Sequence, residues 1–388
     1  MTAATITGAV SPAAVTIAAS TSGFHALCVS SVDPVSADGS AVMLTFDVPS
    51  ELRPSYAFAA GQHVTVRVSI AGVEVRRPYS LCSTPTELHR TGRLRIGVRT
   101  VPGGAFSLYT AGLRPGDDVE VMTPRGGFTT AVEPTRQRRY AAIVAGSGVT
   151  PLMSLVATAL DVEAGSTFTL LYANRGLAST MFVDELAQLK DRFLDRFELF
   201  HLASRQDRGE GLRPGRPDGG RLGELLPRIV DTTAVDEWFL CGPQELCQAA
   251  SSVLTDRGVP SARIRTELFH APAGAPVPSA PIPTAAGEID TGGATVAGTL
   301  TTVAHGSRTT TALLPGRSLL DSALVANPEL PYSCTTGVCG TCRALLVCGE
   351  VEVGAQWALS PEEITAGQIL TCRARPRSSS LTIDYDLS

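Results

Sequence analysis

The sequence lacks an excess of positive charge and lacks any long apolar run. Among 388 residues, 32 Lys and Arg stand against 37 Asp and Glu, so the formal net charge is -5. This balance provides no broad basic surface, which argues against nucleic acid as the main partner. No apolar run approaches the ~20 residues of a membrane span, and residues 1–20 lack the basic start of a secretory signal. We therefore expect a cytoplasmic protein that binds neither nucleic acid nor membrane.

Aromatic and charged residues are also few, at 5% and 18%, whereas hydrophobic residues reach 44%. This composition is typical of a globular protein, and the length suggests two to three domains. Short segments that alternate between apolar and polar residues predict an antiparallel β-barrel over residues 24–139. Short apolar runs that alternate with helical stretches predict an α/β domain with a parallel sheet over residues 140–270.

Two segments outside these domains differ from them in composition. Residues 1–23 are rich in Ala, Thr and Ser without periodicity, and we predict a disordered lead there. Residues 271–293 are rich in Pro and Ala, which is typical of a semi-extended linker. Residues 294–388 then form a third, small domain with strand and helix signals, an α+β pattern. No internal repeat is present.

Nine cysteines, an odd number, show no paired framework, which suits a reducing compartment. Four of them have the spacing C-x4-C-x2-C-x29-C, the plant-type pattern of a 2Fe-2S cluster: Cys334, Cys339, Cys342 and Cys372. Structural zinc is the main alternative, but it usually takes its cysteines from two close pairs. Gly337 and Gly340 allow the loop to turn its N–H groups toward the sulfurs. Because four ligands complete a cluster, we expect a core role for Cys348.

Two motifs in the predicted barrel carry groups that suit a flat ring and a phosphate. RPYS contains Arg77, Tyr79 and Ser80, and an Arg can hold a pyrophosphate while a Tyr ring lies on a heteroaromatic ring. The motif GGAFS (residues 103–107) opens a predicted short helix, where paired glycines and a Ser can hold phosphate. Each motif alone also fits a surface contact between strands or a capped glycine turn.

Two motifs in the predicted α/β domain follow strands, where parallel sheets bind ligands. AGSGVTP (residues 145–151) lies between a strand and a helix, and CGP (residues 241–243) follows the strand EWFL. The first departs from the dinucleotide fingerprint GxGxxG, because Pro151 replaces the last glycine. Cys241 by itself also fits a buried thiol at a strand end.

Taken in order, RPYS, GGAFS and GxGxTP resemble the ferredoxin-NADP reductase superfamily, and residues 294–388 resemble plant-type ferredoxins, which implies a β-grasp fold. The resemblance implies that Arg77 holds the FAD pyrophosphate, Tyr79 stacks on the isoalloxazine and Ser80 lies near flavin N5. It implies further phosphate contacts from Gly103, Gly104 and Ser107. It assigns the pyridine nucleotide to Gly146, Gly148, Thr150, Pro151, Cys241, Gly242 and Pro243, and it makes Ser80 and Cys241 the contacts between nicotinamide and flavin.

The preference for NADPH over NADH depends on cations that can bind the 2'-phosphate. Arg175 follows a predicted strand, and the pair Ser204 and Arg205 resembles that of NADPH-using members of the superfamily. A solvated arginine is the alternative at each position. We therefore predict NADPH as the electron donor, with NADH possible.

The domain order of flavin barrel, nucleotide domain and C-terminal ferredoxin resembles the reductase subunits of multicomponent bacterial oxygenases. The resemblance is strongest to the reductase of phenylacetyl-CoA 1,2-epoxidase and next to that of ketosteroid 9α-hydroxylase. It implies an NAD(P)H-dependent oxidoreductase that passes electrons through FAD and a 2Fe-2S cluster to an oxygenase component. Gln356 and Trp357 stand where we expect Asn and Tyr. Alternatives are a reductase of another ring oxygenase, an electron-transfer subunit of a non-oxygenase enzyme, and a redox sensor.

Overall fold

The computed structural model describes residues 4–9, 23–203, 217–270 and 298–387. The chain divides into two compact units. One unit comprises Phe24–His270, and the other comprises residues 1–23 together with residues 271–388. None of the helices in the described ranges is long and apolar enough to cross a membrane.

The first part of the Phe24–His270 unit is a six-stranded antiparallel sheet in the order β5-β4-β7-β2-β3-β6. Its strands are β2 (Phe24–Pro34), β3 (Ala41–Asp47), β4 (His63–Ile70), β5 (Val73–Ser80), β6 (Arg93–Arg99) and β7 (Asp118–Met122). Its helices are α1 (Pro85–Thr91) and α2 (Ala105–Tyr109). Leu81, just after β5, bridges to Ile96 of β6 and joins the two edges. Inward-facing valines and leucines fill the interior, as alternation along the strands predicts.

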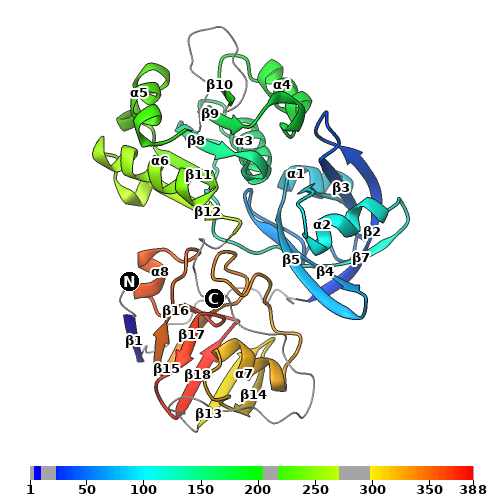
Figure 1. The fold of residues 1–388 in the computed structure, drawn as a ribbon, viewed down its shortest axis with the longest axis vertical. Helices are drawn as coiled ribbons and strands as arrows, with labels where there is room; N and C mark the ends of the chain where they lie inside the picture. Colours follow the sequence, from blue (N-terminus) through cyan, green and yellow to red (C-terminus); the bar gives the residue numbers. More distant parts are fainter. Residues whose placement is uncertain (1–3, 10–22, 204–216, 271–297, 388) are drawn as a thin grey trace. The chain divides into compact units, whose positions relative to one another are not determined.

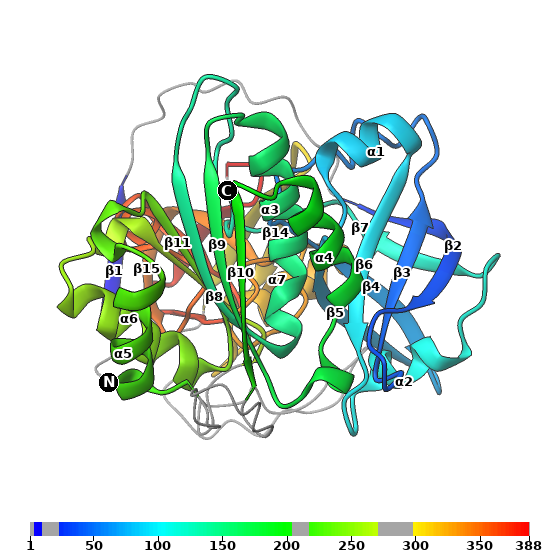
Figure 2. The same cartoon turned by 90° about the horizontal axis from the view of Figure 1, so that it is seen from above.

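The second part of this unit is a parallel sheet in the order β10-β9-β8-β11-β12. Its strands are β8 (Arg139–Ala145), β9 (Thr167–Asn174), β10 (Phe197–Ala203), β11 (Glu237–Gly242) and β12 (Ile264–Leu268). Its helices are α3 (Thr150–Val162), α4 (Val183–Arg192), α5 (Gly219–Ile229) and α6 (Gln244–Asp256). Helices α5 and α6 cover one face and α3 and α4 the other (Figures 1 and 2). The strand order reverses between β8 and β11, where such sheets bind ligands.

The barrel and the parallel sheet share one hydrophobic core. Ala60 and Cys82 of the barrel belong to the same buried cluster as Leu155 of α3 and Phe239 of β11. A Cβ at Gly61 of the barrel would lie 2.0 Å from the carbonyl oxygen of Phe128 in the segment between the two parts and 3.2 Å from the Leu155 side chain of α3, so there is no room for a side chain there. This contact leaves little freedom for the barrel to shift on the sheet.

The other unit is a mixed sheet in the order β1-β15-β18-β13-β14, with β16 and β17 also paired to β15. Its strands are β1 (Ala4–Ala9), β13 (Thr299–Ala304), β14 (Ser307–Ala312), β15 (Arg343–Val353), β16 (Gln368–Leu370), β17 (Ala374–Pro376) and β18 (Ser380–Asp384). Its helices are α7 (Leu319–Ala326) and α8 (Pro361–Thr365). Strands β13 and β18 pair in parallel, and α7 buries its leucines against the sheet. All three predicted fold classes are confirmed.

The structure differs from the sequence prediction in two elements. Ala4–Ala9, within the predicted disordered lead, pairs with β15 as an antiparallel strand, because β15 otherwise presents an unpaired edge. Helix α5 was not singled out from the sequence, because Pro227 and three glycines within GGRLGELLPRI weaken its pattern. Asp218 caps its first turn, and its leucines are buried.

The predicted core role for Cys348 is wrong, because its side chain is exposed. Leu346, two residues earlier on β15, is fully buried, and strict alternation would bury Cys348 as well. The pairing of β15 with β18 shifts register between these two residues. Such an irregularity breaks the alternation and turns Cys348 outward.

Candidate functional site

The end of strand β5 presents the three residues of the RPYS motif differently. Arg77 is exposed and donates one hydrogen bond to the Arg76 carbonyl at 2.8 Å, while Ser80 is buried. Tyr79 lies between them, and burial raises the pKa of its hydroxyl to about 12, against a smaller opposing effect of Arg77. Its ring packs on Phe106 with centroids 5.3 Å apart. An exposed cation and a fixed neutral ring at one strand end suit a phosphate and a flat heteroaromatic ring.

The loop before α2 is built around its glycines and Ser107. Gly103 has φ of 72°, which favours glycine. A Cβ at Gly104 would lie 2.4 Å from Ser107 Oγ. The Ser107 hydroxyl accepts from the Val101 N–H at 3.2 Å and donates to the Gly104 carbonyl at 3.1 Å. The serine therefore holds the loop in shape with its side chain, and the glycine backbone is the part of this loop left open to a phosphate.

The turn after β8 packs directly on the end of β11. Gly146 has φ of 57°, and Pro151 stands in the first turn of α3. A Cβ at Gly148 would lie 2.4 Å from the carbonyl oxygen of Cys241, so only glycine fits there. The predicted residues of GSGVTP and CGP thus meet at the point where the strand order reverses. This is the place where a dinucleotide approaches the backbone in an open α/β sheet.

A carboxylate that the sequence analysis missed lies between these two parts. Glu267, near the end of β12, accepts a hydrogen bond from Ser80 Oγ at 3.3 Å and pairs in register with Cys241. Burial raises the pKa of Glu267 to about 8, although the Ser80 hydrogen bond lowers it. Burial and the nearby Glu267 raise the pKa of the Cys241 thiol, which stays protonated. A carboxylate at the carboxyl end of a strand was the available signal, but β12 itself was not predicted.

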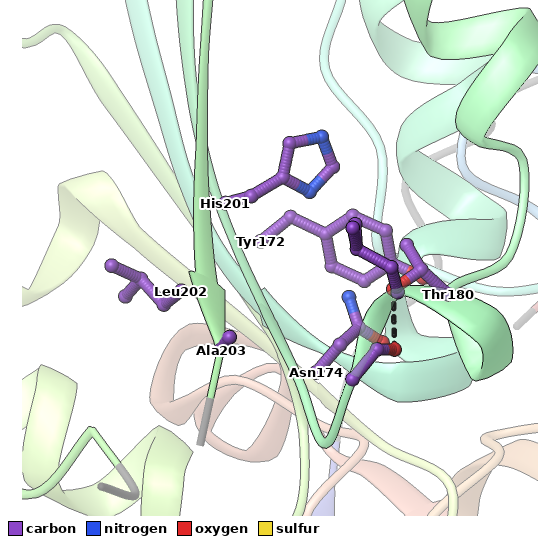
Figure 3. Close-up of a pocket in the computed structure, with 8 residues that line it drawn as sticks. Tyr172, Asn174, Thr180, His201, Leu202 and Ala203 are labelled. Atoms are coloured by element: carbon purple, nitrogen blue, oxygen red, sulfur yellow. Dashed lines mark hydrogen bonds between the residues drawn. The ribbon is translucent and has the colours of Figure 1, made fainter. Parts of the chain in front are cut away.

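The structure also places a pocket at the carboxyl ends of β9 and β10 (Figure 3). Tyr172 and His201 face each other in it with ring centroids 5.8 Å apart, and Asn174 lies beside Thr180. The Nδ2 atom of Asn174 is buried and has no hydrogen-bond partner within the described chain. Arg175 follows directly and is exposed. Ser204 and Arg205 lie outside the described residues.

Arg99, at the end of β6, was not singled out by its sequence. Its Nη2 donates to the Ser179 carbonyl at 2.6 Å, which joins the barrel to the loop beside this pocket. Its Nε is buried without a hydrogen-bond partner in the part of the chain that the structure describes. A barrel cation with a spare donor next to the nucleotide turn can hold an anionic group.

The four predicted cluster ligands, Cys334, Cys339, Cys342 and Cys372, interact as two pairs. Cys339 hydrogen-bonds the Cys334 sulfur and lowers the pKa of Cys334. Cys372 acts in the same way on Cys342. No group of three or more His, Cys, Asp or Glu side chains in the described ranges is placed to hold a single metal ion. Two pairs of thiols fit a cluster of two irons in which each iron takes two protein sulfurs.

Neighbouring loops fix the cluster loop by backbone contacts. The Trp357 N–H donates to the Gly337 carbonyl at 2.9 Å, and the Thr341 N–H donates to Cys339 Sγ at 3.5 Å. The Gln356 side chain accepts from the Leu359 N–H at 2.8 Å and so shapes the same turn. Trp357 therefore supports the loop through its backbone, and Gln356 supports it through its side-chain amide.

The chain matches three domain families in this order. The oxidoreductase FAD-binding domain matches residues 27–130, and the oxidoreductase NAD-binding domain matches residues 142–252. The 2Fe-2S iron-sulfur cluster binding domain matches residues 303–377. The chain is 36% identical, over 94% of its length and 98% of the relative's, to a component of 1,2-phenylacetyl-CoA epoxidase from Escherichia coli. The chain belongs to the family of FAD- and 2Fe-2S-containing reductases.

Two further relatives agree with this assignment. The ferredoxin reductase component of 3-ketosteroid-9-alpha-monooxygenase from Mycobacterium tuberculosis is 32% identical to the reductase over 94% of this chain and 97% of its own. The structure of phthalate dioxygenase reductase has a TM-score of 0.52 and 24% identity, and it covers 93% of this chain and 98% of its own. The last likeness confirms the fold. The reductase is an oxidoreductase with domains for FAD, NAD(P) and a 2Fe-2S cluster.

Proposed function

We propose that the reductase takes electrons from NADPH and delivers them, through FAD and the 2Fe-2S cluster, to the oxygenase component of a phenylacetyl-CoA 1,2-epoxidase. The observation that carries the partner is the 36% identity to the epoxidase component across 94% of the chain. The 32% identity to the ketosteroid reductase favours a ketosteroid 9α-hydroxylase as the second candidate. Both candidates need the same internal electron transfer and differ only in the acceptor.

Bound FAD would supply the conversion between hydride transfer from the nucleotide and single-electron transfer to the cluster. The residues of the chain bind and orient the groups that react. Arg77 and the backbone at Gly103 and Gly104 would hold the FAD phosphates, and Tyr79 would lie on the flavin ring. Ser80, Cys241 and Glu267 would form the buried floor where nicotinamide meets flavin. No side chain need act as a general acid or base.

The preference for NADPH is supported by an exposed arginine beside the pocket of Figure 3 and by a second arginine that the sequence places after β10. Arg175 is exposed at the end of β9, and Arg205 follows β10 in the sequence. A 2'-phosphate needs such a cation, whereas the free 2'-hydroxyl of NADH does not. We expect Arg205→Ala to lower kcat/KM for NADPH at least tenfold and to leave kcat/KM for NADH within about twofold, measured with ferricyanide as acceptor.

The experiment that tests the function is an anaerobic titration of the purified reductase with NADPH. Flavin absorbance should bleach first and cluster absorbance next; a flavin that NADPH cannot reduce would contradict the proposal. Cys339→Ser should lose the cluster spectrum and keep flavin reduction, whereas Cys348→Ser should change neither, since Cys348 is exposed and is not a predicted ligand. Turnover with the epoxidase component, and none with the ketosteroid oxygenase, would identify the acceptor.

A further inference from the structure

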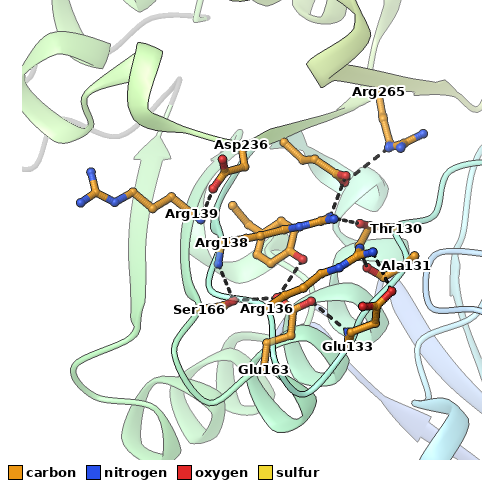
Figure 4. Close-up of polar contacts among 12 residues, drawn as sticks. Thr130, Ala131, Glu133, Arg136, Arg138, Arg139, Glu163, Ser166, Asp236 and Arg265 are labelled. Carbon is orange, nitrogen blue, oxygen red and sulfur yellow. Dashed lines mark hydrogen bonds and ion pairs between the residues drawn. The ribbon is translucent and has the colours of Figure 1, made fainter.

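A polar network lies where the barrel continues into the parallel sheet. The connecting segment, residues 123–138, leaves β7 and reaches the amino end of β8. At its end, Arg138 Nη1 donates to Thr130 Oγ1 at 3.1 Å and to Glu237 Oε1 at 3.0 Å (Figure 4). Arg265 Nε lies 3.5 Å from the other carboxylate oxygen of Glu237. One guanidinium thus ties the connecting segment to β11, and Glu237 continues the tie to β12.

A second anchor in the same network holds the backbone of the connecting segment. The carboxylate of Glu163 is fully buried after α3 and accepts from Ser166 Oγ at 2.6 Å and from Tyr140 Oη at 3.0 Å. It also accepts from the Glu133 N–H at 3.1 Å. Ser166 Oγ in turn accepts from the Arg138 N–H at 2.8 Å. A buried carboxylate with three donors is a rigid support, and it fixes the base from which the Arg138 side chain extends.

The network and the redox site occupy one face of the sheet. Glu237, Phe239 and Cys241 alternate along β11 and therefore share a face, with Phe239 opposite Arg265 and Cys241 opposite Glu267 on β12. Four residues of strand place Glu237 roughly 13 Å from Cys241.

The connecting segment and the barrel contact the same face in matching order. Thr130 is linked to Glu237 because Arg138 donates a hydrogen bond to each of them. Two residues before Thr130, the Phe128 ring packs on Phe239 with centroids 5.4 Å apart. Ser80 of the barrel then meets Glu267.

We propose that Arg138 is a positioning residue for hydride transfer. Its bonds to Thr130 and Glu237 set the position of the connecting segment along β11. The position of this segment in turn decides how Ser80 of the barrel lies against Glu267 and Cys241. The inference rests on hydride delivery from NAD(P)H to flavin at that site. Both bonds come from Nη1, whose two N–H groups have fixed directions in the planar guanidinium, so it bonds two acceptors in one geometry.

The neighbouring arginine provides a matched control. Arg139 is exposed and points to the opposite face of the sheet, since successive strand residues alternate. Its backbone N–H, not its side chain, bonds the Asp236 carboxylate at 2.8 Å. Arg139→Met therefore removes the same charge one residue away without touching the connecting segment.

The test is an anaerobic stopped-flow measurement of flavin reduction by NADPH on the full-length holoenzyme. We expect Arg138→Met to lower the limiting rate constant by about tenfold to a hundredfold, since a misplacement near 1 Å has that effect on a transfer step. The Kd for NADPH and the flavin content should stay within twofold. Arg138→Lys should recover part of the rate, because an ammonium can bond Thr130 or Glu237 but lacks the fork. Arg139→Met should match the wild type.

The outcomes separate this inference from the proposed function. Wild type that NADPH does not reduce contradicts the proposed function, whereas an Arg138→Met enzyme with lower thermal stability and an unchanged limiting rate overturns the inference. If Arg138→Met does not retain FAD, Thr130→Val decides, because it removes only one acceptor of the guanidinium; an unchanged limiting rate there also overturns the inference. The double variant Arg138→Met with Glu237→Gln should lower the limiting rate constant by less than the two single variants predict when their effects are combined.

Discussion

At the scale of single residues, the redox site depends on protonation states that burial sets. Cys241 and Cys82 are buried thiols whose pKa values burial raises, so both stay neutral. Glu267 differs from these thiols, because its pKa of about 8 lies near working pH. Its carboxyl group holds a proton below that value and becomes a negative charge beside Ser80 above it. The charge of the site therefore changes with pH at this residue.

We expect the limiting rate of flavin reduction to fall as pH rises through about 8, because ionised Glu267 would place a negative charge where a hydride must arrive. Glu267→Gln should remove the inflection near pH 8 from the plot of limiting rate against pH, as measured by stopped-flow between pH 6 and 10. A profile in the variant that keeps the same inflection would assign it to another group.

The same shift has a consequence for stability. The folded-state pKa is raised above the ordinary value of 4.5, so between about 4.5 and 8 the folded protein binds more protons at this site than the unfolded chain. The contribution of Glu267 to the free energy of unfolding therefore falls as pH rises through that window, and it is constant above it. Glu267→Gln should flatten this part of the stability profile.

At the scale of elements, the turn after β8 and the end of β11 form one packed contact. Gly148 lies against the Cys241 carbonyl, and a Cβ at Gly242 would lie 3.2 Å from the Ala145 nitrogen. Because of these close approaches, the turn after β8 and the turn after β11 lie side by side. The alternation and turn signals predicted both elements, because each depends on residues near in the chain. Their mutual contact depends on the order of strands in the sheet.

We expect Gly148→Ala to destabilise the reductase by about 1–3 kcal/mol, the usual cost of forcing extra volume into a packed site. It should also raise the Kd for NADPH, because the turn must move away from Cys241. Gly223→Ala in α5 is the control, since its Cβ meets nothing within 4 Å and alanine favours a helix. Thermal unfolding and NADPH titration would measure both; equal behaviour of the two variants would contradict the packing argument.

At the scale of the whole molecule, the chain consists of two units with separate cores. Phe24–His270 contains the barrel core and the core that the barrel shares with the sheet. The other unit buries its own leucines around Cys342 and Cys372. Each core is complete within its own unit, which suits a relay whose two halves do different redox chemistry.

We expect a variant that comprises residues 24–270 to bind FAD and to oxidise NADPH with ferricyanide at a rate within about twofold of the full chain. The reason is that the flavin and nucleotide motifs lie within this unit, which has its own hydrophobic cores. The cluster spectrum should be absent. Loss of FAD from this variant, with the full chain as control, would show that the unit does not fold by itself.

Local patterns predicted most of the elements and all of the motif residues. Strands such as β4 and β6 alternate cleanly, and RPYS, GSGVTP and the cysteine spacing are each readable within a few residues. Helix α5 was not recognised because glycine and proline weaken its periodicity. The prediction of a core role for Cys348 was wrong because a register shift interrupts β15. The predicted ligands and contacts remain predictions that the experiments above test.

The sequence by itself determined the three domain classes, the cofactor motifs and the candidate cluster ligands, since these depend on spacing along a short stretch of chain. Only the tertiary structure decided that Ser80 meets Glu267, 187 residues later, and that Arg138 ties Thr130 to Glu237. It also paired the four thiols two and two. Such contacts follow from strand order and from the close packing of barrel on sheet, and neither is encoded in the spacing of neighbouring residues.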